Sequence, residues 1–288
     1  MSELVARRPP PRAAYALPTL FTAGNLFLGY LSLLRTFQGA LLVAGNPSAA
    51  ADNFAVAAKT IGIAVVLDGL DGRIARMTNT TSAFGGELDS LADIVSFGIA
   101  PALLAFGWGI QFADLGTATG AADHLQRAGK FVAFLFLVCG AARLARFNVQ
   151  KNPMPKNPGR PHRKYFVGLP IPPAAGMVAA VVYAFDGEPI KSWPFSVAWL
   201  ALLSLLSFLM VSTWRYHSFK DLNLSRPRST LMVIALAGLI FAIWNYSQPV
   251  LLALASAYVA SGIFIRIGGV LRRHLRPSPP QRQEHQIG

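Results

Sequence analysis

The sequence predicts an all-α polytopic membrane protein. Apolar residues make up 53% of the chain and charged residues only 14%, whereas a soluble domain carries about 25% charged residues. The mean hydropathy is +0.43. Apolar runs of about 20 residues recur along the chain, and this is the length at which a helix crosses a bilayer. A soluble protein with apolar core helices would not leave several such runs almost free of charge.

The apolar runs predict about eight transmembrane helices, which cover residues 17–38, 54–72, 86–108, 130–147, 168–186, 194–213, 229–246 and 248–270. The first run follows a basic segment, as in a signal peptide, but it continues past Leu34 without a small-residue cleavage site, so we expect a retained span. We expect a flexible cytoplasmic N-terminus over 1–16, one transmembrane domain over 17–272 and a disordered basic cytoplasmic tail over 273–288.

The net charge is +13, and the basic residues are distributed along the chain in accord with the predicted topology. If the N-terminus is cytoplasmic, 21 of the 26 lysines and arginines fall in the termini or in loops on the cytoplasmic side. The positive-inside rule therefore predicts that both termini face the cytoplasm. Anionic lipid headgroups would attract this face, so the basic charge does not indicate a nucleic-acid partner.

Acidic residues gather between the second and third predicted spans. Five of the 13 carboxylates lie within DGLDGRIARMTNTTSAFGGELDSLAD, residues 68–93. Asp68 and Asp71 end one span, and Asp89 and Asp93 begin the next, so spacings of three and four residues place each pair on one helix face. Four carboxylates this close need a counter-charge. Oxygen donors without His or Cys favour Mg²⁺ or Mn²⁺, with Ca²⁺ possible, and two metal ions would suit phosphoryl displacement.

Two other interpretations of the acidic cluster remain at this point. The cluster could be a helix-end charge group neutralised by Arg73, Arg76 and water. A cation transporter also uses intramembrane acids. Against a transporter, these acids gather at one membrane edge instead of crossing the midplane.

The residues around the aspartates are suited to a phosphate ligand. Gly72 and Gly85 permit close approach of a ligand or helix, and Ala75 is small. Arg76 offers a planar, permanent cation, and Ser82 offers a hydroxyl donor. Each of these residues is ordinary alone, and either glycine alone would be a packing residue.

Together these residues spell D-x2-D-G-x2-A-R-x8-G-x3-D-x3-D. This pattern resembles the signature of the CDP-alcohol phosphatidyltransferase family, with all eight fixed positions matched. The resemblance implies a six-helix core, usually in a homodimer, with a dimetal site at the cytoplasmic membrane edge. It also implies a reaction in which a CDP-lipid gives its phosphatidyl group to an alcohol and releases CMP.

The resemblance also implies roles for individual residues. Asp68, Asp71 and Asp89 would ligate metal, and Asp93 would ligate the second metal ion and act as general base. The residues that would hold the CDP-lipid are Gly72, Ala75, Arg76, Ser82 and Gly85, with Thr22 and Asn25 from the first span. For Thr22 and Asn25, hydrogen bonding between helices is the plain alternative.

The alcohol acceptor is indicated by other stretches. Residues 17–30, 87–102, 142–148, 165–176 and 209–224 resemble the phosphatidylserine synthase branch of this family. This resemblance implies CDP-diacylglycerol and L-serine as substrates, and a location in a cell membrane of the bacterial inner-membrane type. Arg143, Arg146 and Asn148 could receive the serine carboxylate, and Ser96 could line the pocket. Positive-inside flanking for the arginines and packing for the serine are the alternatives. Glycerol 3-phosphate, inositol and choline stay open as acceptors, because the signature does not name one.

Overall fold

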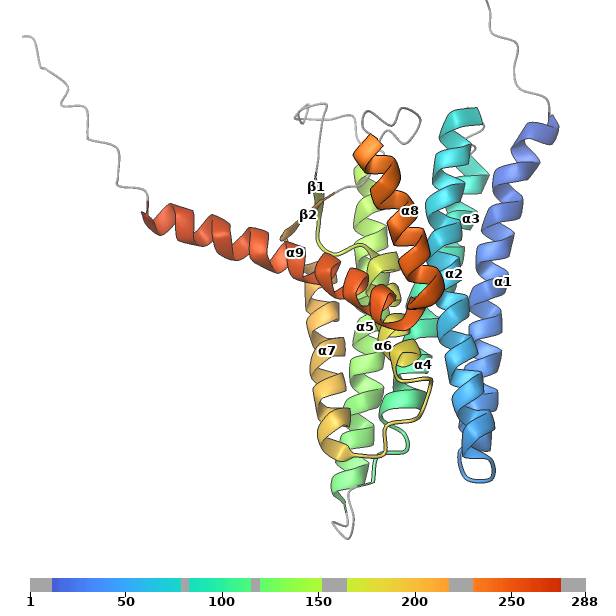
Figure 1. Cartoon of the computed structure of the whole chain (residues 1–288), viewed down its shortest axis with the longest axis vertical. Coiled ribbons are helices and arrows are strands. Elements are labelled where there is room, and N and C mark those ends of the chain that lie inside the picture. Colours follow the sequence, from blue (N-terminus) through green and yellow to red (C-terminus); the bar gives the residue numbers. More distant parts are fainter. Residues whose placement is uncertain (1–11, 79–82, 115–119, 152–164, 218–229, 276–288) are drawn as a thin grey trace, which may run out of the picture.

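The protein is a bundle of long helices. The computed structural model describes residues 12–78, 83–114, 120–151, 165–217 and 230–275. Within these ranges the bundle consists of α1 (Arg12–Leu42), α2 (Pro47–Thr78), α3 (Ala83–Asp93), α4 (Ala100–Gly109), α5 (Ala121–Lys151), α6 (Ile171–Ala184) and α7 (Trp193–Val211), which run along a common axis (Figure 1). Five described segments are long and apolar enough to cross a membrane: Pro47–Leu70, Phe84–Gly109, Ala121–Val149, Trp193–Val211 and Ser247–Gly268. The prediction of an all-helical, multi-pass membrane protein is confirmed.

The last two helices have different directions. α8 (Thr230–Asn245) lies along the bundle, whereas α9 (Ser247–Leu275) runs across it (Figure 1). The sequence predicted a span over 248–270, and Ser247–Gly268 of α9 is long and apolar enough to cross a membrane. Length and hydropathy do not determine the tilt of a helix, which is decided by its packing partners. Here α9 packs against α6 and a short strand at the end of α7.

That strand belongs to a two-stranded sheet that the sequence did not predict. β1 (Tyr165–Val167) pairs antiparallel with β2 (Arg215–His217) and joins the entry of α6 to the exit of α7. Gly168 follows β1 with φ +78°, and its N–H donates to the Trp214 carbonyl at 2.8 Å. A Cβ at this position would lie 2.5 Å from the Met210 carbonyl oxygen. Only glycine fits this turn without strain.

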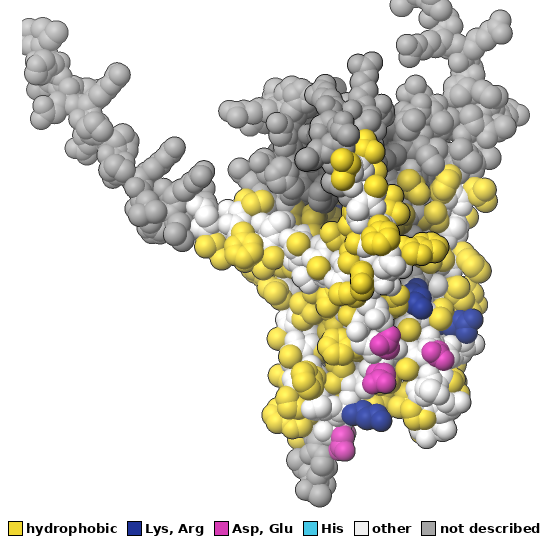
Figure 2. All heavy atoms as spheres, viewed as in Figure 1, with side chains coloured by type: hydrophobic (Ala, Val, Ile, Leu, Met, Phe, Trp, Pro, Cys, Tyr) yellow, Lys and Arg dark blue, Asp and Glu magenta, His cyan; other side chains and the backbone are white. Residues whose placement is uncertain are grey.

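Helix α1 shows the burial pattern of a membrane helix, with small and polar residues on its inner face and apolar residues on its outer face. The buried face of α1 carries Thr22, Asn25, Gly29, Ser32 and Thr36. Its exposed positions include Leu20, Phe27, Tyr30, Phe37 and Leu41. Figure 2 shows apolar side chains spread over the side of the bundle, with few charged ones between them. Small residues let helices approach closely within a bilayer, and apolar residues face the lipid.

Two tryptophans fix the packing of α4 against α7. Trp108 is buried, and its ring meets Trp199 edge-on with centroids 5.2 Å apart. The Trp199 Nε1–H donates to the Ala105 carbonyl at 2.9 Å. Gly109 makes this possible, because a Cβ there would overlap the Trp199 ring.

The predicted span over 86–108 is helical, but it contains a π-helical turn. This turn, η1 (Ile94–Ile99), separates α3 from α4, and the Ala100 N–H bonds to the Val95 carbonyl five residues back. Pro101 has no N–H to donate, and its ring crowds the carbonyl four residues earlier. A wider turn before the proline relieves that crowding. The turn begins directly after Asp93.

Candidate active site

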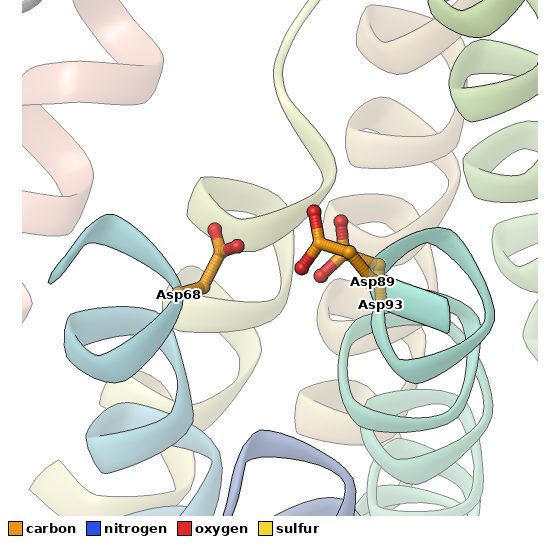
Figure 3. A group of neighbouring side chains, drawn as sticks. All are labelled: Asp68, Asp89 and Asp93. Carbon is orange, nitrogen blue, oxygen red and sulfur yellow. The ribbon is translucent and has the colours of Figure 1, made fainter. Parts of the chain in front are cut away.

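Three of the four predicted aspartates meet at one end of the bundle. Asp68 projects from α2 toward Asp89 and Asp93, which lie one turn apart on α3 (Figure 3). One carboxylate oxygen from each residue lies within 4.8 Å of the others. Asp93 is buried, and the other two are half-buried. Asp71 belongs to α2, but its side chain lies outside the described residues.

The geometry of this cluster fits a divalent cation. Two oxygens bound to one ion are separated by at most twice the metal–oxygen distance, which is about 4.2 Å for Mg²⁺ and about 4.8 Å for Ca²⁺. The three oxygen atoms are close enough together to bind Ca²⁺, and their separations need to shorten only slightly to bind Mg²⁺. An all-carboxylate donor set is also the chemistry these hard cations prefer. Asp68, Asp89 and Asp93 can therefore hold a divalent metal ion.

Asp93 is held from the side by α1. The Asn25 Nδ2–H donates to Asp93 Oδ1 at 3.5 Å. The hydroxyl of Ser96, which is fully buried, donates to the Asn25 carbonyl at 2.8 Å. Gly29, one turn further along α1, leaves room for Ser96, since a Cβ there would overlap the serine side chain. Thr22 is buried one turn before Asn25 on the same face. These contacts tie α1 to the start of η1.

Arg143 is the acceptor-side candidate that lies near the carboxylates. It is only 9% exposed, on α5, and its Nε has no hydrogen-bond partner in the described part of the chain. Its positive charge attracts Asp93, and its helix packs against η1, the turn that follows Asp93. A buried guanidinium with a free donor is costly unless an acceptor reaches it. An anionic group of a ligand would meet that need.

The other two candidates on α5 make contacts elsewhere. Arg146 is exposed, and its Nη1 donates to the Val211 carbonyl at 3.5 Å, at the end of α7. The Asn148 Nδ2–H donates to the Ser90 hydroxyl at 2.8 Å, which links α5 to α3. Both contacts connect helices beside the cluster.

Several predicted CDP-binding residues lie outside the described part of the site. Ala75 and Arg76 belong to α2, but their side chains are not described, and Ser82 lies outside the described residues. Gly72 is exposed near the end of α2, and Gly85 is half-buried at the start of α3. Both glycines therefore flank the aspartates on the two helices that carry them.

Sequence reasoning missed the contact that holds α9 on the bundle, in which Tyr258 takes part. The run ASAYVASG, residues 255–262, belongs to the last predicted span, to which no role was assigned. A single aromatic residue among small ones was the only signal there. It became meaningful only when the structure brought Tyr258 against the ring of Tyr216, with the centroids 5.8 Å apart.

These features define an integral membrane protein with a carboxylate cluster suited to a divalent metal ion. Residues 15–209 match the family described as CDP-alcohol phosphatidyltransferase, which is more than half of the chain. The chain belongs to this family, and the resemblance drawn from the aspartate pattern is confirmed. The match ends at α7, so α8 and α9 lie beyond it.

Relatives from bacteria and archaea extend the similarity. The chain is 36% identical over 229 residues to the CDP-diacylglycerol–serine O-phosphatidyltransferase of Helicobacter pylori (strain 26695), covering 79% of this chain and 83% of that protein. It is 31% identical over 205 residues to the Bacillus subtilis protein of the same name, covering 71% and 91%. It is also 31% identical over 204 residues to the archaetidylserine synthase of Methanothermobacter thermautotrophicus, covering 70% and 69%.

Proposed function

We propose that this protein is a phosphatidylserine synthase of phospholipid biosynthesis. It transfers the phosphatidyl group of CDP-diacylglycerol to the hydroxyl of L-serine and releases CMP. The observation that carries the proposal is the buried Arg143 beside the carboxylate cluster. Two relatives of this chain are named CDP-diacylglycerol–serine O-phosphatidyltransferase. A permanent cation next to the reacting centre is suited to the carboxylate of serine.

The carboxylate cluster holds divalent metal ions in this proposal. Asp68, Asp71 and Asp89 ligate metal, and Asp93 also ligates the second ion, with Mg²⁺ or Mn²⁺ favoured by the oxygen donors. When bound, the ions would neutralise the diphosphate and stabilise charge on the leaving group. The grouping of Asp68, Asp89 and Asp93 within 4.8 Å supports a divalent ion held by these three residues.

Asp93 acts as the general base. It accepts the proton of the serine hydroxyl as that oxygen attacks the lipid-side phosphorus. A P–O bond to serine forms, the P–O bond to CMP breaks, and CMP leaves with the bonding electron pair. The hydrogen bond from Asn25 restrains the Asp93 carboxylate for this step. A base positioned in this way would contribute about 10²- to 10⁴-fold to the rate.

The CDP part of the lipid lies along the ends of α2 and α3. The proposed contacts are Gly72, Ala75, Arg76, Ser82 and Gly85, and Thr22 and Asn25 face the same region from α1. Arg76 would pair with a phosphate, and the glycines would let the nucleotide approach the backbone. These assignments rest on the family pattern in the sequence.

The site is proposed to face the cytoplasm, at the edge of the membrane. The positive-inside distribution supports cytoplasmic termini and a cytoplasmic position for the aspartates of α2 and α3. Lipid then reaches the site laterally and serine reaches it from water. A homodimer is proposed on the family resemblance.

A different alcohol acceptor is the main alternative function. Arg143 would also bind the phosphate of glycerol 3-phosphate, whereas inositol and choline offer it no anion. The test is CMP release from CDP-diacylglycerol by the purified protein in detergent, with Mg²⁺ or Mn²⁺ and each alcohol offered separately. We expect release with serine alone, abolished by EDTA. Release with another alcohol would overturn the acceptor, and release insensitive to EDTA would overturn the metal assignment.

A further inference from the structure

The helix that carries two of the three grouped aspartates buries few of its side chains. α3 packs against α1, but among its described residues only Ala92 and Asp93 are buried, and both belong to its last turn. Phe84 and Leu91 are 72% and 63% exposed. Packing restrains the rotation of a helix through the side chains that it inserts between its neighbours. The part of α3 before Ala92, which includes Asp89, therefore depends on other contacts for its position.

A chain of two hydrogen bonds from α5 reaches this part of α3. The Asn148 Nδ2–H donates to the Ser90 hydroxyl at 2.8 Å, and the Ser90 hydroxyl donates to the Gly86 carbonyl at 3.0 Å. A serine hydroxyl has one proton to donate and lone pairs that accept, so the two bonds are compatible. Ser90 follows Asp89 directly and precedes Asp93 by three residues. The chain therefore ties α5 to the turn of α3 that carries the aspartates.

A small rotation of α3 would change the distances between the carboxylates. A side-chain atom at the periphery of a helix lies about 5–6 Å from the axis, so a rotation of about 10° moves it by about 1 Å. Metal–oxygen distances in a site vary by only about 0.2 Å. Asp68 belongs to α2 and does not turn with α3 (Figure 3). The grouping of its oxygen with those of Asp89 and Asp93 within 4.8 Å therefore depends on the rotation of α3.

We propose that Asn148 is a positioning residue that holds α3 in the rotation at which Asp89 and Asp93 meet Asp68 for metal binding. This inference rests on the proposed function, because it concerns the divalent ion assigned to that same site. Asn148 acts through Ser90 and not on the acceptor. Its role therefore differs from the serine-binding role that the sequence suggested for it.

The test removes each partner of the bond and measures how Mn²⁺ stabilises the protein. Asn148→Ala removes the donor, Ser90→Ala removes the acceptor, and the double variant removes both. Because Mn²⁺ binds the folded protein, it raises Tm, and the Mn²⁺ concentration that gives half of the full rise reports the affinity. We expect this concentration to increase about fivefold to tenfold in each single variant, because one neutral hydrogen bond outside the ligands is lost. The double variant should show no further increase, since both substitutions break the same bond.

Asn245→Ala is the matched control for the loss of an asparagine hydrogen bond. The Asn245 Nδ2–H also donates to a helix carbonyl, that of Phe241, at 2.9 Å, but on α8 and outside the aspartate group. Its Mn²⁺ midpoint should equal that of the wild type. The Tm in EDTA measures the stability of each variant separately. A lower Tm in EDTA with an unchanged Mn²⁺ midpoint in Asn148→Ala would show a merely structural role and would overturn the proposal. Additive effects in the double variant would overturn it as well.

The KM for serine separates positioning of α3 from contact with the acceptor. At saturating Mn²⁺ the serine KM of Asn148→Ala should stay within about twofold of the wild-type value, because uniform binding of serine is retained. A rise of about tenfold with an unchanged Mn²⁺ midpoint would place Asn148 in the acceptor site and overturn the proposal.

Failure of the proposed function would be recognised in the wild-type protein. CMP release with another alcohol would overturn serine as the acceptor, whereas the Mn²⁺ midpoints, measured without substrate, would still decide the role of Asn148. A wild-type Tm that does not respond to Mn²⁺ would overturn the metal assignment and this inference together. A wild-type response that all variants share unchanged would overturn this inference alone.

Discussion

Replacing Asp93 by asparagine should separate catalysis from stability. The substitution preserves side-chain volume and removes one negative charge from a group whose oxygens lie within 4.8 Å of one another. Turnover should fall by about 10²- to 10⁴-fold, because the proposed general base is lost. Binding of the CDP-lipid should be largely retained, since the other proposed contacts remain.

The effect on stability follows from the repulsion between carboxylates. Two unit charges 4.8 Å apart repel by about 3.5 kcal/mol at an effective dielectric constant of about 20. Asp93 faces two such neighbours, but Asp68 and Asp89 are half-exposed and screened by water. We therefore expect Asp93→Asn to raise the free energy of unfolding of the metal-free protein by about 1–3 kcal/mol. In EDTA the Tm of Asp93→Asn should be equal to or above that of the wild type.

The assay measures Tm with EDTA and with Mn²⁺, alongside CMP release. In the wild type Mn²⁺ should raise Tm, and in Asp93→Asn this gain should shrink because one ligand is lost. Glu87→Gln is the matched control, because Glu87 is an exposed carboxylate on the same helix outside the aspartate group. Near-normal turnover in Asp93→Asn would refute its role as base. A lower Tm in EDTA would refute the repulsion argument.

Three further predictions test the packing and the acceptor side. Gly29→Ala should destabilise the protein by about 1–3 kcal/mol, because a Cβ would overlap Ser96. Gly62→Ala is the control and should be neutral or slightly stabilising, because a Cβ at Gly62 would lie in open space. The Tm values of the two variants check this prediction, and equal values would contradict it. Trp199→Phe should cost about 1–3 kcal/mol by leaving a buried carbonyl of α4 without its donor, and an unchanged Tm would exclude a role for that bond. Arg146→Ala should change the KM for serine less than twofold, because this side chain is exposed and bonds the end of α7; a tenfold rise would place it in the acceptor site.

The helices were predictable because a bilayer imposes a simple rule on the chain. Each span needs about 20 apolar residues, and runs such as 54–72 and 194–213 meet that rule within helices of the structure. The direction of α9 could not be predicted in this way. It depends on Tyr216 filling the space at Gly262, a contact between residues 46 positions apart in the sequence. The same holds for the β1–β2 pair, whose three-residue strands are too short for a periodic signal.

The aspartate cluster was predictable because its spacing is local. The four-residue spacing places Asp89 and Asp93 on one face of α3, and the structure brings Asp68 of α2 to them. The residues proposed to bind the acceptor were harder to predict from spacing alone. Arg143 and Arg146 are both arginines of the same helix, three residues apart, and only the tertiary structure distinguishes the buried one from the exposed one.

The π-helical turn after Asp93 determines how the part of the span that carries the aspartates is rotated relative to the part that packs in the core. A π turn accommodates one more residue than an α turn, and one residue corresponds to about 100° of rotation. Deleting one residue within Ile94–Ile99 would restore an α-helix, but the two halves would then be rotated against each other. If Trp108 kept its place in the core, Asp89 and Asp93 would turn away from Asp68. This one irregular turn therefore determines the angle between the half of the span that carries the aspartates and the half that packs in the core.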